Sequence, residues 1–210
     1  MNPRIKVCGL TRLEDVQVAV EAGANAIGLV FYPPSPRYVD LAKAAELAFA
    51  VPPFVTIVGL FVNADPAVVR ETLAAVPIHL LQFHGDEDEV YCRQFDRPYM
   101  KVARVRPGMD LVQYAADFPS AQAILLDAFV DGFGGGGKVF DWSLIPQALG
   151  KPLVLSGGLD AANVGEAVAR VRPAAVDVSS GVEVAKGIKD AGKIRAFCAA
   201  VQSVGLLPID

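Results

Sequence analysis

The stretches PLVLSGG (152–158) and AAVDVSSG (174–181) decide the fold, because each is an apolar strand that runs directly into a turn of small residues. Such turns expose backbone N–H groups, which bind anions well. Two of them on consecutive late strands are typical of a (β/α)8 barrel, which builds its phosphate site from the loops after strands seven and eight. A pair of ordinary tight turns is the alternative. The predicted phosphate-binding residues are Gly157, Gly158, Ser179, Ser180 and Gly181.

Short β-rich runs alternate with helical segments along the whole chain, which predicts an α/β fold, a single (β/α)8 TIM barrel domain over residues 1–210. The strands are apolar on both faces, as expected where helices cover one side and a barrel core fills the other. An open doubly wound sheet is the rival architecture. The eight expected strands are Arg4–Cys8, Ala26–Phe31, Val55–Val62, His79–His84, Tyr99–Arg104, Ala123–Asp127, Pro152–Ser156 and Ala175–Ser179.

Composition narrows the class of partner. The chain has 210 residues, 53% hydrophobic, with a net charge of -4 and no cationic stripe, which argues against nucleic acid as a partner. No apolar run reaches membrane-spanning length, and charged residues occupy the place of a signal peptide's apolar core. Cys8, Cys92 and Cys198 are odd in number and far apart, which favours reduced thiols in the cytoplasm. A phosphorylated small molecule is the expected partner, and the sequence does not indicate an oligomeric state.

Two residues at predicted strand ends suit acid–base chemistry. Functional side chains of a barrel lie at the C-terminal ends of its strands, where Cys8 and Asp127 are expected. Lys6 shares a strand face with Cys8, and a nearby ammonium favours the reactive thiolate; core packing is the alternative for this cysteine. Asp127 follows the apolar run AILL, where partial removal from water suits a general acid; a loop cap is the alternative. One of the two can act as base and the other as acid.

Two further residues are expected to contact substrate or core. Arg37, in the proline-rich YPPSPR (32–37), presents a guanidinium that matches a substrate carboxylate; a solvated loop arginine is the alternative. His84, in QFHGDEDE (82–89), is expected to contact a ligand or to satisfy the core. We predict no metal site here, because no further ligands stand at a recognisable spacing. The remaining candidates at the predicted rim are Asn63, Arg104, Ser156 and Asp177.

The glycine run DGFGGGGK (131–138) resembles two nucleotide-binding motifs without satisfying either. Its glycines match G-x-G-x-x-G and most of a Walker A pattern, but Val139 replaces the required Ser or Thr and the run does not follow a strand directly. A flexible lid after the sixth strand is the interpretation we favour, and a plain linker is the alternative.

Together these motifs resemble those of the phosphoribosylanthranilate isomerase family, which acts in tryptophan biosynthesis. The resemblance extends from about Lys6 to Lys189, in order and spacing. The motifs that carry it are KVCGLTRLED (6–15), AIGLVFYPPSPR (26–37), FVTIVGLFVN (54–63), LQFHGDE (81–87), ILLD (124–127) with GGGGKVFDW (134–142), VLSGGL (154–159) and VDVSSGVE (176–183).

The resemblance implies a (β/α)8 barrel, no cofactor, and an Amadori rearrangement of N-(5-phosphoribosyl)anthranilate to 1-(2-carboxyphenylamino)-1-deoxyribulose 5-phosphate. By position, Cys8 resembles the general base, Asp127 the general acid, and Arg37 the arginine that meets the anthranilate carboxylate. The turns after Ser156 and Asp177 resemble the phosphate site. Another phosphosugar isomerase barrel, which would use two aspartates, and a non-catalytic phosphosugar-binding barrel are the alternatives.

Overall fold

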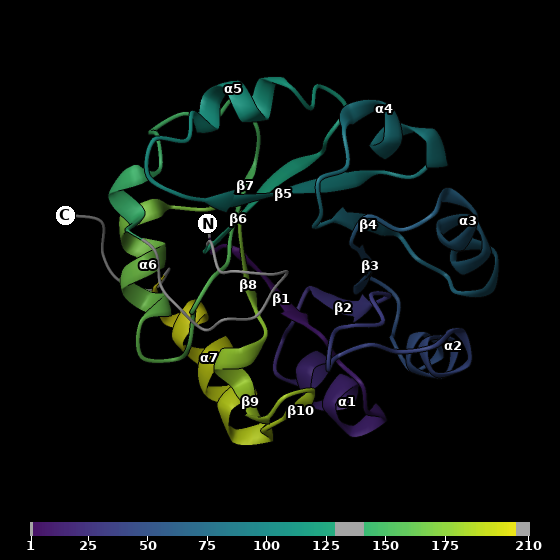
Figure 1. Ribbon diagram of the computed structural model, residues 1–210. Helices are drawn as coiled ribbons and strands as arrows, with labels where there is room; N and C mark the ends of the chain where they lie inside the picture. The colour runs from purple at the N-terminus through teal and green to yellow at the C-terminus, as the bar shows by residue number, and fades with distance from the viewer. Residues whose placement is uncertain (1, 129–140, 205–210) are drawn as a thin grey trace.

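Eight parallel strands close into a barrel with helices packed around it (Figure 1). The computed structural model describes residues 2–128 and 141–204. Neighbouring strands pair in chain order, and β1 closes the ring by pairing with β8. The strands are β1 (Arg4–Cys8), β2 (Ala26–Val30), β3 (Thr56–Phe61), β4 (Leu80–Phe83), β5 (Tyr99–Val105), β6 (Ala123–Ala128), β7 (Leu153–Leu155) and β8 (Ala175–Val178). All eight predicted strands are therefore present, within one or two residues at each end.

Helices follow most of the strands and cover the outside of the barrel. They are α1 (Leu13–Glu21), α2 (Leu41–Phe49), α3 (Pro66–Ala75), α4 (Glu89–Cys92), α5 (Leu111–Ala116), α6 (Val164–Val171) and α7 (Ala191–Val204), with the 3-10 turns η1 (Arg93–Phe95), η2 (Trp142–Leu144) and η3 (Ser180–Val182). The side chains of Asp40 and Asp65 accept amide hydrogen bonds at the starts of α2 and α3. None of the helices in the described ranges has the length and hydropathy of a membrane span.

Strand alternation separates two apolar layers. Val7 on β1 and Phe83 on β4 belong to the large outer core between barrel and helices. Residues one position away point to the barrel axis, where Val58, Leu125 and Val154 fill the lower interior. The same alternation brings Lys6, Cys8, Gln82, Ser156 and Asp177 to the inside, together with Asp127 at the upper end of β6. The sequence thus folds its polar strand-end residues toward one mouth.

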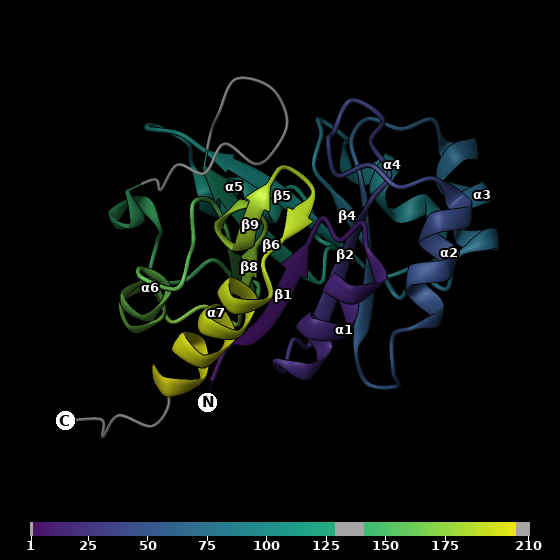
Figure 2. The same cartoon turned by 90° about the horizontal axis from the view of Figure 1, so that it is seen from below.

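A short hairpin stands beside that mouth. It consists of β9 (Glu183–Ala185) and β10 (Ile188–Lys189), which follow η3 at the end of β8. Seen from the side, the hairpin lies at the upper end of the barrel, away from the N-terminus (Figure 2). Its position places Glu183 and Lys189 next to the end of β1, as the contacts below show.

Candidate active site

Cys8 lies at the mouth of the barrel, where β1 ends. It is buried, and it packs with Val30, Leu60 and Val62 in a small apolar cluster. Its register partner on β2 is Gly28, where an added Cβ would lie only 2.7 Å from the Cys8 sulfur. The absence of a side chain at Gly28 therefore creates the space that the thiol occupies.

A buried ion pair lies on the same strand face as Cys8, one layer deeper in the barrel. The ammonium nitrogen of Lys6 donates to Oδ1 of Asp177 at 2.8 Å, and Ser156 Oγ donates to Oδ2 at 3.2 Å. Burial works against the charge of Lys6, but Asp177 and the hydrogen-bonded Cys8 give it a raised pKa overall. Asp177, whose direction the sequence leaves open, thus points into the barrel network.

The ionisation of Cys8 is shaped by opposing effects. Burial, the largest effect, raises the pKa of the Cys8 thiol, and the Asp177 carboxylate raises it further. The Lys6 ammonium acts in the opposite direction by its charge and by a hydrogen bond to the sulfur, and Lys189 adds a smaller effect of the same sign. Burial and Asp177 disfavour the thiolate, and the cations reduce the cost of forming it.

Asp127 lies across the mouth from Cys8, on β6. Its Oδ1 accepts from the amide of Ala128 at 2.9 Å, and its Oδ2 lies 3.3 Å from Nε2 of His84. The His84 contact is an electrostatic one rather than an aligned hydrogen bond. Nδ1 of His84 lies 3.3 Å from the side-chain nitrogen of Gln82. An amide N–H donated to Nδ1 selects the tautomer that carries its proton on Nε2, toward Asp127.

Asp127 also lies against the turn after β7. Gly157 has a φ of +85°, and a Cβ at that position would approach the Asp127 carboxylate to 3.0 Å. A glycine here therefore satisfies both the left-handed backbone and the close approach of the carboxylate. The candidate acid is held between His84 on one side and the first predicted phosphate turn on the other.

Arg37 is buried, so the interpretation of this residue as a solvated loop arginine is wrong. The loop after β2 folds back through a bridge between Val30 and Tyr38, which brings Arg37 over the mouth. Its guanidinium forms a bidentate pair with Glu183, with Nε–Oε1 2.7 Å and Nη2–Oε2 2.8 Å. One edge of the guanidinium that we expect to bind a substrate carboxylate therefore binds Glu183. Nη1 lies on the opposite edge.

Glu183 links Arg37 to the β9–β10 hairpin and to the end of β8. Lys189 donates to Oε1 of Glu183 at 2.9 Å and to the carbonyl and hydroxyl oxygens of Ser179. Ser179 in turn donates to the carbonyl oxygen of Cys8 at 3.0 Å. Burial opposes the ionised form of Glu183, but the hydrogen bond from Arg37 and the Lys189 charge leave its pKa lowered overall. A chain of charged contacts therefore joins the loop of Arg37 to the backbone of the candidate base.

The two predicted phosphate turns lie against each other. A Cβ on Gly181 would collide with the carbonyl of Leu159, which belongs to the turn after β7. Within residues 2–128 and 141–204, the amide N–H groups of Gly157 and Gly158 donate to no backbone or side-chain acceptor. Ser180 and Gly181 form η3, whose start faces the same region. The arrangement presents N–H groups from two strands side by side.

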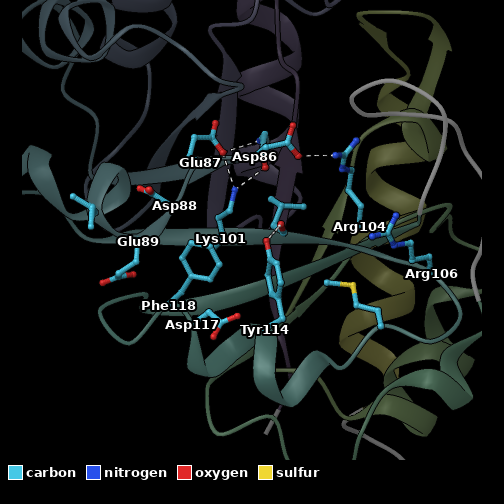
Figure 3. A pocket seen from close by; sticks show the side chains of 14 residues that line it. Asp86, Glu87, Asp88, Glu89, Lys101, Arg104, Arg106, Tyr114, Asp117 and Phe118 are labelled. Atoms are coloured by element: carbon cyan, nitrogen blue, oxygen red, sulfur yellow. Dashed lines mark hydrogen bonds and ion pairs between the residues drawn. The ribbon is translucent and has the colours of Figure 1, made fainter.

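A cavity of about 560 Å3 lies between the turn after His84, β5 and α5, and the contacts of Lys101 and Glu87 beside it hold that turn in place. Lys101 donates to the Gly85 carbonyl and to Glu87, both at 2.7 Å, and its ammonium lies 5.6 Å from the Phe118 ring centre (Figure 3). Glu87 also accepts from the amides of Asn63 and Gly85. Asn63, a predicted rim residue, therefore belongs to this Glu87 hydrogen-bond network rather than to the mouth.

The neighbouring contacts involve Arg104 and the acidic residues that follow His84. Arg104 is the register partner of Asp127, and its guanidinium donates to Asp86 at 2.9 Å (Figure 3). Of the acidic residues after His84, Asp88 caps α4 and Glu89 is in its first turn, whereas Asp86 and Glu87 precede the helix. Asp86 and Glu87 instead bind Arg104 and Lys101.

The other two cysteines and Trp142 are buried. Cys92 and Cys198 are buried free thiols in α4 and α7, as expected for core residues, and Trp142 is buried in η2. No group of three or more His, Cys, Asp or Glu side chains in the described part of the chain is arranged to hold a metal ion. The glycine run 131–138, with its lid interpretation, lies outside the described residues.

Sequence reasoning missed Glu183, Lys189 and Gln82. Glu183 lies 146 positions from Arg37, so that only the closed barrel brings them together. Gln82 has a local signal, because it stands two residues before His84 on the same strand face.

The model of one protein family, N-(5'phosphoribosyl)anthranilate (PRA) isomerase, matches residues 5–200. The chain belongs to this family. An N-(5'-phosphoribosyl)anthranilate isomerase from Dechloromonas aromatica (strain RCB) is 67% identical over 202 residues, which cover 96% of this chain and 97% of that protein. The family resemblance seen in the motifs is therefore confirmed.

Solved structures agree with the barrel. The crystal structure of phosphoribosyl anthranilate isomerase from Thermotoga maritima is 40% identical, covers 96% of this chain and 99% of that chain, and superposes with a TM-score of 0.89. A structure of phosphoribosyl anthranilate isomerase in complex with reduced 1-(o-carboxyphenylamino)-1-deoxyribulose 5-phosphate is 38% identical with the same coverage and a TM-score of 0.86. The second relative binds a phosphorylated analogue.

Proposed function

We propose that this isomerase converts N-(5'-phosphoribosyl)anthranilate to 1-(2-carboxyphenylamino)-1-deoxyribulose 5-phosphate, in tryptophan biosynthesis, with Cys8 as general base and Asp127 as general acid. The observation that carries the proposal is the placement of these two side chains at one mouth, at the ends of β1 and β6, facing the axis. A substrate held between them would meet a proton donor on one side and a proton acceptor on the other.

The two groups act in sequence on the sugar. Protonated Asp127 donates its proton to the ribose ring oxygen as the bond from that oxygen to the anomeric carbon breaks, which gives an iminium ion. The Cys8 thiolate then removes the proton from the adjacent carbon, and its electron pair forms the double bond of an enolamine. The enolamine tautomerises to the ketone by losing its hydroxyl proton and gaining one at the former anomeric carbon. Acid and base end the reaction in the opposite protonation states, and proton exchange resets them.

The two ends of the substrate are proposed to be held by different parts of the mouth. Arg37 would bind the anthranilate carboxylate through the guanidinium edge that Glu183 does not use. The phosphate would lie at Gly157, Gly158, Ser179, Ser180 and Gly181. His84, close to Asp127, would contact the ribose. Binding at both ends would fix the reacting carbons between acid and base.

The two alternatives make different demands. A related phosphosugar isomerase with two aspartates would require a carboxylate where Cys8 stands. A non-catalytic phosphosugar-binding barrel would require the two turns alone, and it would not require an acid and a base aligned across the mouth. The residues at both β1 and β6 therefore favour the isomerase.

Three further expectations concern the domain organisation, the compartment and the partners of the protein. We expect residues 1–210 to form a single barrel domain. We expect the protein to act in the cytoplasm, because Cys8, Cys92 and Cys198 are free thiols. We expect no nucleic acid or membrane partner, since the net charge is -4 and the sequence contains no cationic stripe.

The test is the decay of substrate fluorescence when freshly prepared phosphoribosylanthranilate is mixed with the purified protein. We expect full conversion, unchanged after exhaustive dialysis against EDTA. No conversion would reject the function. Activity that is lost on dialysis and restored by a divalent ion would reject the cofactor-free mechanism while keeping the reaction.

A further inference from the structure

A buried charge pair lies beneath Cys8. The side chains of Lys6 and Asp177 are 5% and 6% exposed, and their 2.8 Å contact crosses from β1 to β8 inside the barrel. An ion pair at such depth is weak evidence for stability, because removing two charges from water costs about as much as their attraction returns. The barrel interior below it is apolar, so an apolar pair would also fit there. The position of the pair therefore suggests a role in the chemistry above it.

The pair is part of a larger charged set around the thiol. β2 and the end of β3 pack apolar side chains against Cys8. The charged groups around it are Lys6 on β1, Arg37 in the loop after β2, Asp177 on β8, Lys189 on β10, and Glu183 on β9, which pairs with Arg37 and Lys189. Three of these are cations and two are carboxylates. A neutral thiol leaves one positive charge in excess, and a thiolate balances the set.

We propose that Lys6 is a positioning residue that promotes ionisation of the Cys8 thiol, and that Asp177, held by Ser156, restrains that effect. Lys6 is on the same face of β1 as Cys8, two residues along the strand, so its ammonium is placed to balance a thiolate, and its charge favours that form. Asp177 engages the same ammonium from the other side. The two partners compete for one positive charge.

The arrangement explains how a buried thiol serves as a base without remaining permanently ionised. A strongly acidified cysteine is a weaker base, since its affinity for a proton falls with its pKa. Burial and the Asp177 carboxylate both favour the thiol, and the Lys6 ammonium stabilises the thiolate when the proton leaves. This inference rests on the proposed function only for its consequence in catalysis; the competition itself concerns Cys8 alone.

The test is the pH titration of Cys8 in the full chain, followed by the ultraviolet absorbance of its thiolate, with Cys8→Ser versions of each protein as blanks. Asp177→Asn is expected to lower the midpoint and to increase the thiolate fraction near neutrality about tenfold. Lys6→Met, of similar length and without charge, is expected to raise the midpoint. Glu46→Gln, which removes an exposed carboxylate beside Lys43, is the matched control and should leave the midpoint unchanged.

A second measurement needs no variant that breaks a buried pair. In wild-type protein labelled at lysine nitrogen and cysteine carbon, the Lys6 ammonium and Cys8 resonances should move with one common midpoint. Midpoints for Cys8 that stay unchanged in both variants, or a Lys6 resonance that ignores the Cys8 titration, would overturn the inference. In activity, Asp177→Asn should move the acidic limb of the kcat/KM profile to lower pH, whereas a merely structural loss would lower the profile at every pH.

The failure of this inference differs from the failure of the proposed function. If Cys8→Ala retains turnover, Cys8 is not the base, but its titration in the Lys6 and Asp177 variants still shows whether they control it. If Cys8→Ala is inactive and the titrations do not respond, the base assignment stands and the role of the pair is rejected.

Discussion

The two sides of the barrel mouth treat their proton-transfer groups differently. On the β1–β8 side, Cys8 is surrounded by charge: Lys6 and Asp177 lie below it, and the Arg37–Glu183–Lys189 set lies beside it. On the β4–β6 side, Asp127 meets a backbone amide, the His84 ring and a glycine turn. The proposed base, which must become an anion, has cations beside it. The proposed acid has the His84 ring, a backbone amide and a glycine turn as its closest partners, with the Arg104 guanidinium on the adjacent strand bound to Asp86. The comparison indicates how one mouth would support opposite protonation states.

The largest effect is expected from removing either proton-transfer group. Cys8→Ala and Asp127→Asn should each reduce turnover by about 10²–10⁴-fold, because a placed acid or base typically contributes that much. Both side chains lie at the mouth, so the barrel core stays filled and circular dichroism should be unchanged. If Cys8→Ala turns over at near wild-type rate, Cys8 is a packing residue and the charged side of the mouth has another purpose.

A smaller loss is expected from the arginine that joins the loop after β2 to the charged side. Arg37→Ala should raise KM about 10- to 150-fold, the equivalent of about 1.5–3 kcal/mol for a lost charged hydrogen bond, with a lesser change in kcat. Glu183→Gln is the matched variant: it keeps Arg37 and loosens its orientation, so its KM should rise less. A fall in kcat with an unchanged KM for Arg37→Ala would reject its assignment to the substrate carboxylate.

On the β4–β6 side, His84 is expected to have a modest effect. His84→Ala should lower kcat about tenfold, because it removes one polar neighbour of Asp127 worth about 1–1.5 kcal/mol. His84→Gln retains an N–H donor and should recover part of that loss. Equal activity of His84→Ala and wild type would show that Asp127 works without this contact. The groups around Asp127 would then contribute even less than the charged groups around Cys8.

The smallest effect is expected for a fragment of the substrate. Inorganic phosphate should inhibit competitively with an inhibition constant on the order of millimolar, because a small anion uses only one end of the site. A crystal soaked in phosphate or sulfate should show the anion between Gly157–Gly158 and Ser179–Gly181. An anion found only near the 134–137 glycine run would contradict the site assignment.

Much of the fold and half of the site follow from local sequence patterns. Short apolar runs that alternate with helical segments locate the eight strands, and the strand ends select Cys8 and Asp127, because a parallel barrel gathers these ends at one mouth. The 3-10 turn η2 within residues 141–152 has no such signal.

The partners of these residues could not be predicted from the sequence. Lys6 and Asp177 are 171 positions apart, and Arg37 and Glu183 are 146 positions apart. Each pair exists only because the barrel closes β8 onto β1 and the β9–β10 hairpin follows. Local patterns carry information about strands and turns, whereas the electrostatics of Cys8 depend on contacts that appear only after the chain has closed.

The most direct test of the account is a double-mutant cycle across the mouth. We predict that Cys8→Ala combined with Asp127→Asn loses much less turnover than the product of the two single losses, because acid and base act on one reaction and neither is useful without the other. Turnover and circular dichroism of all four proteins, measured side by side, decide it. Losses that multiply fully would show that the two residues act independently, and would contradict a mechanism in which the two sides of the mouth work as one acid–base pair.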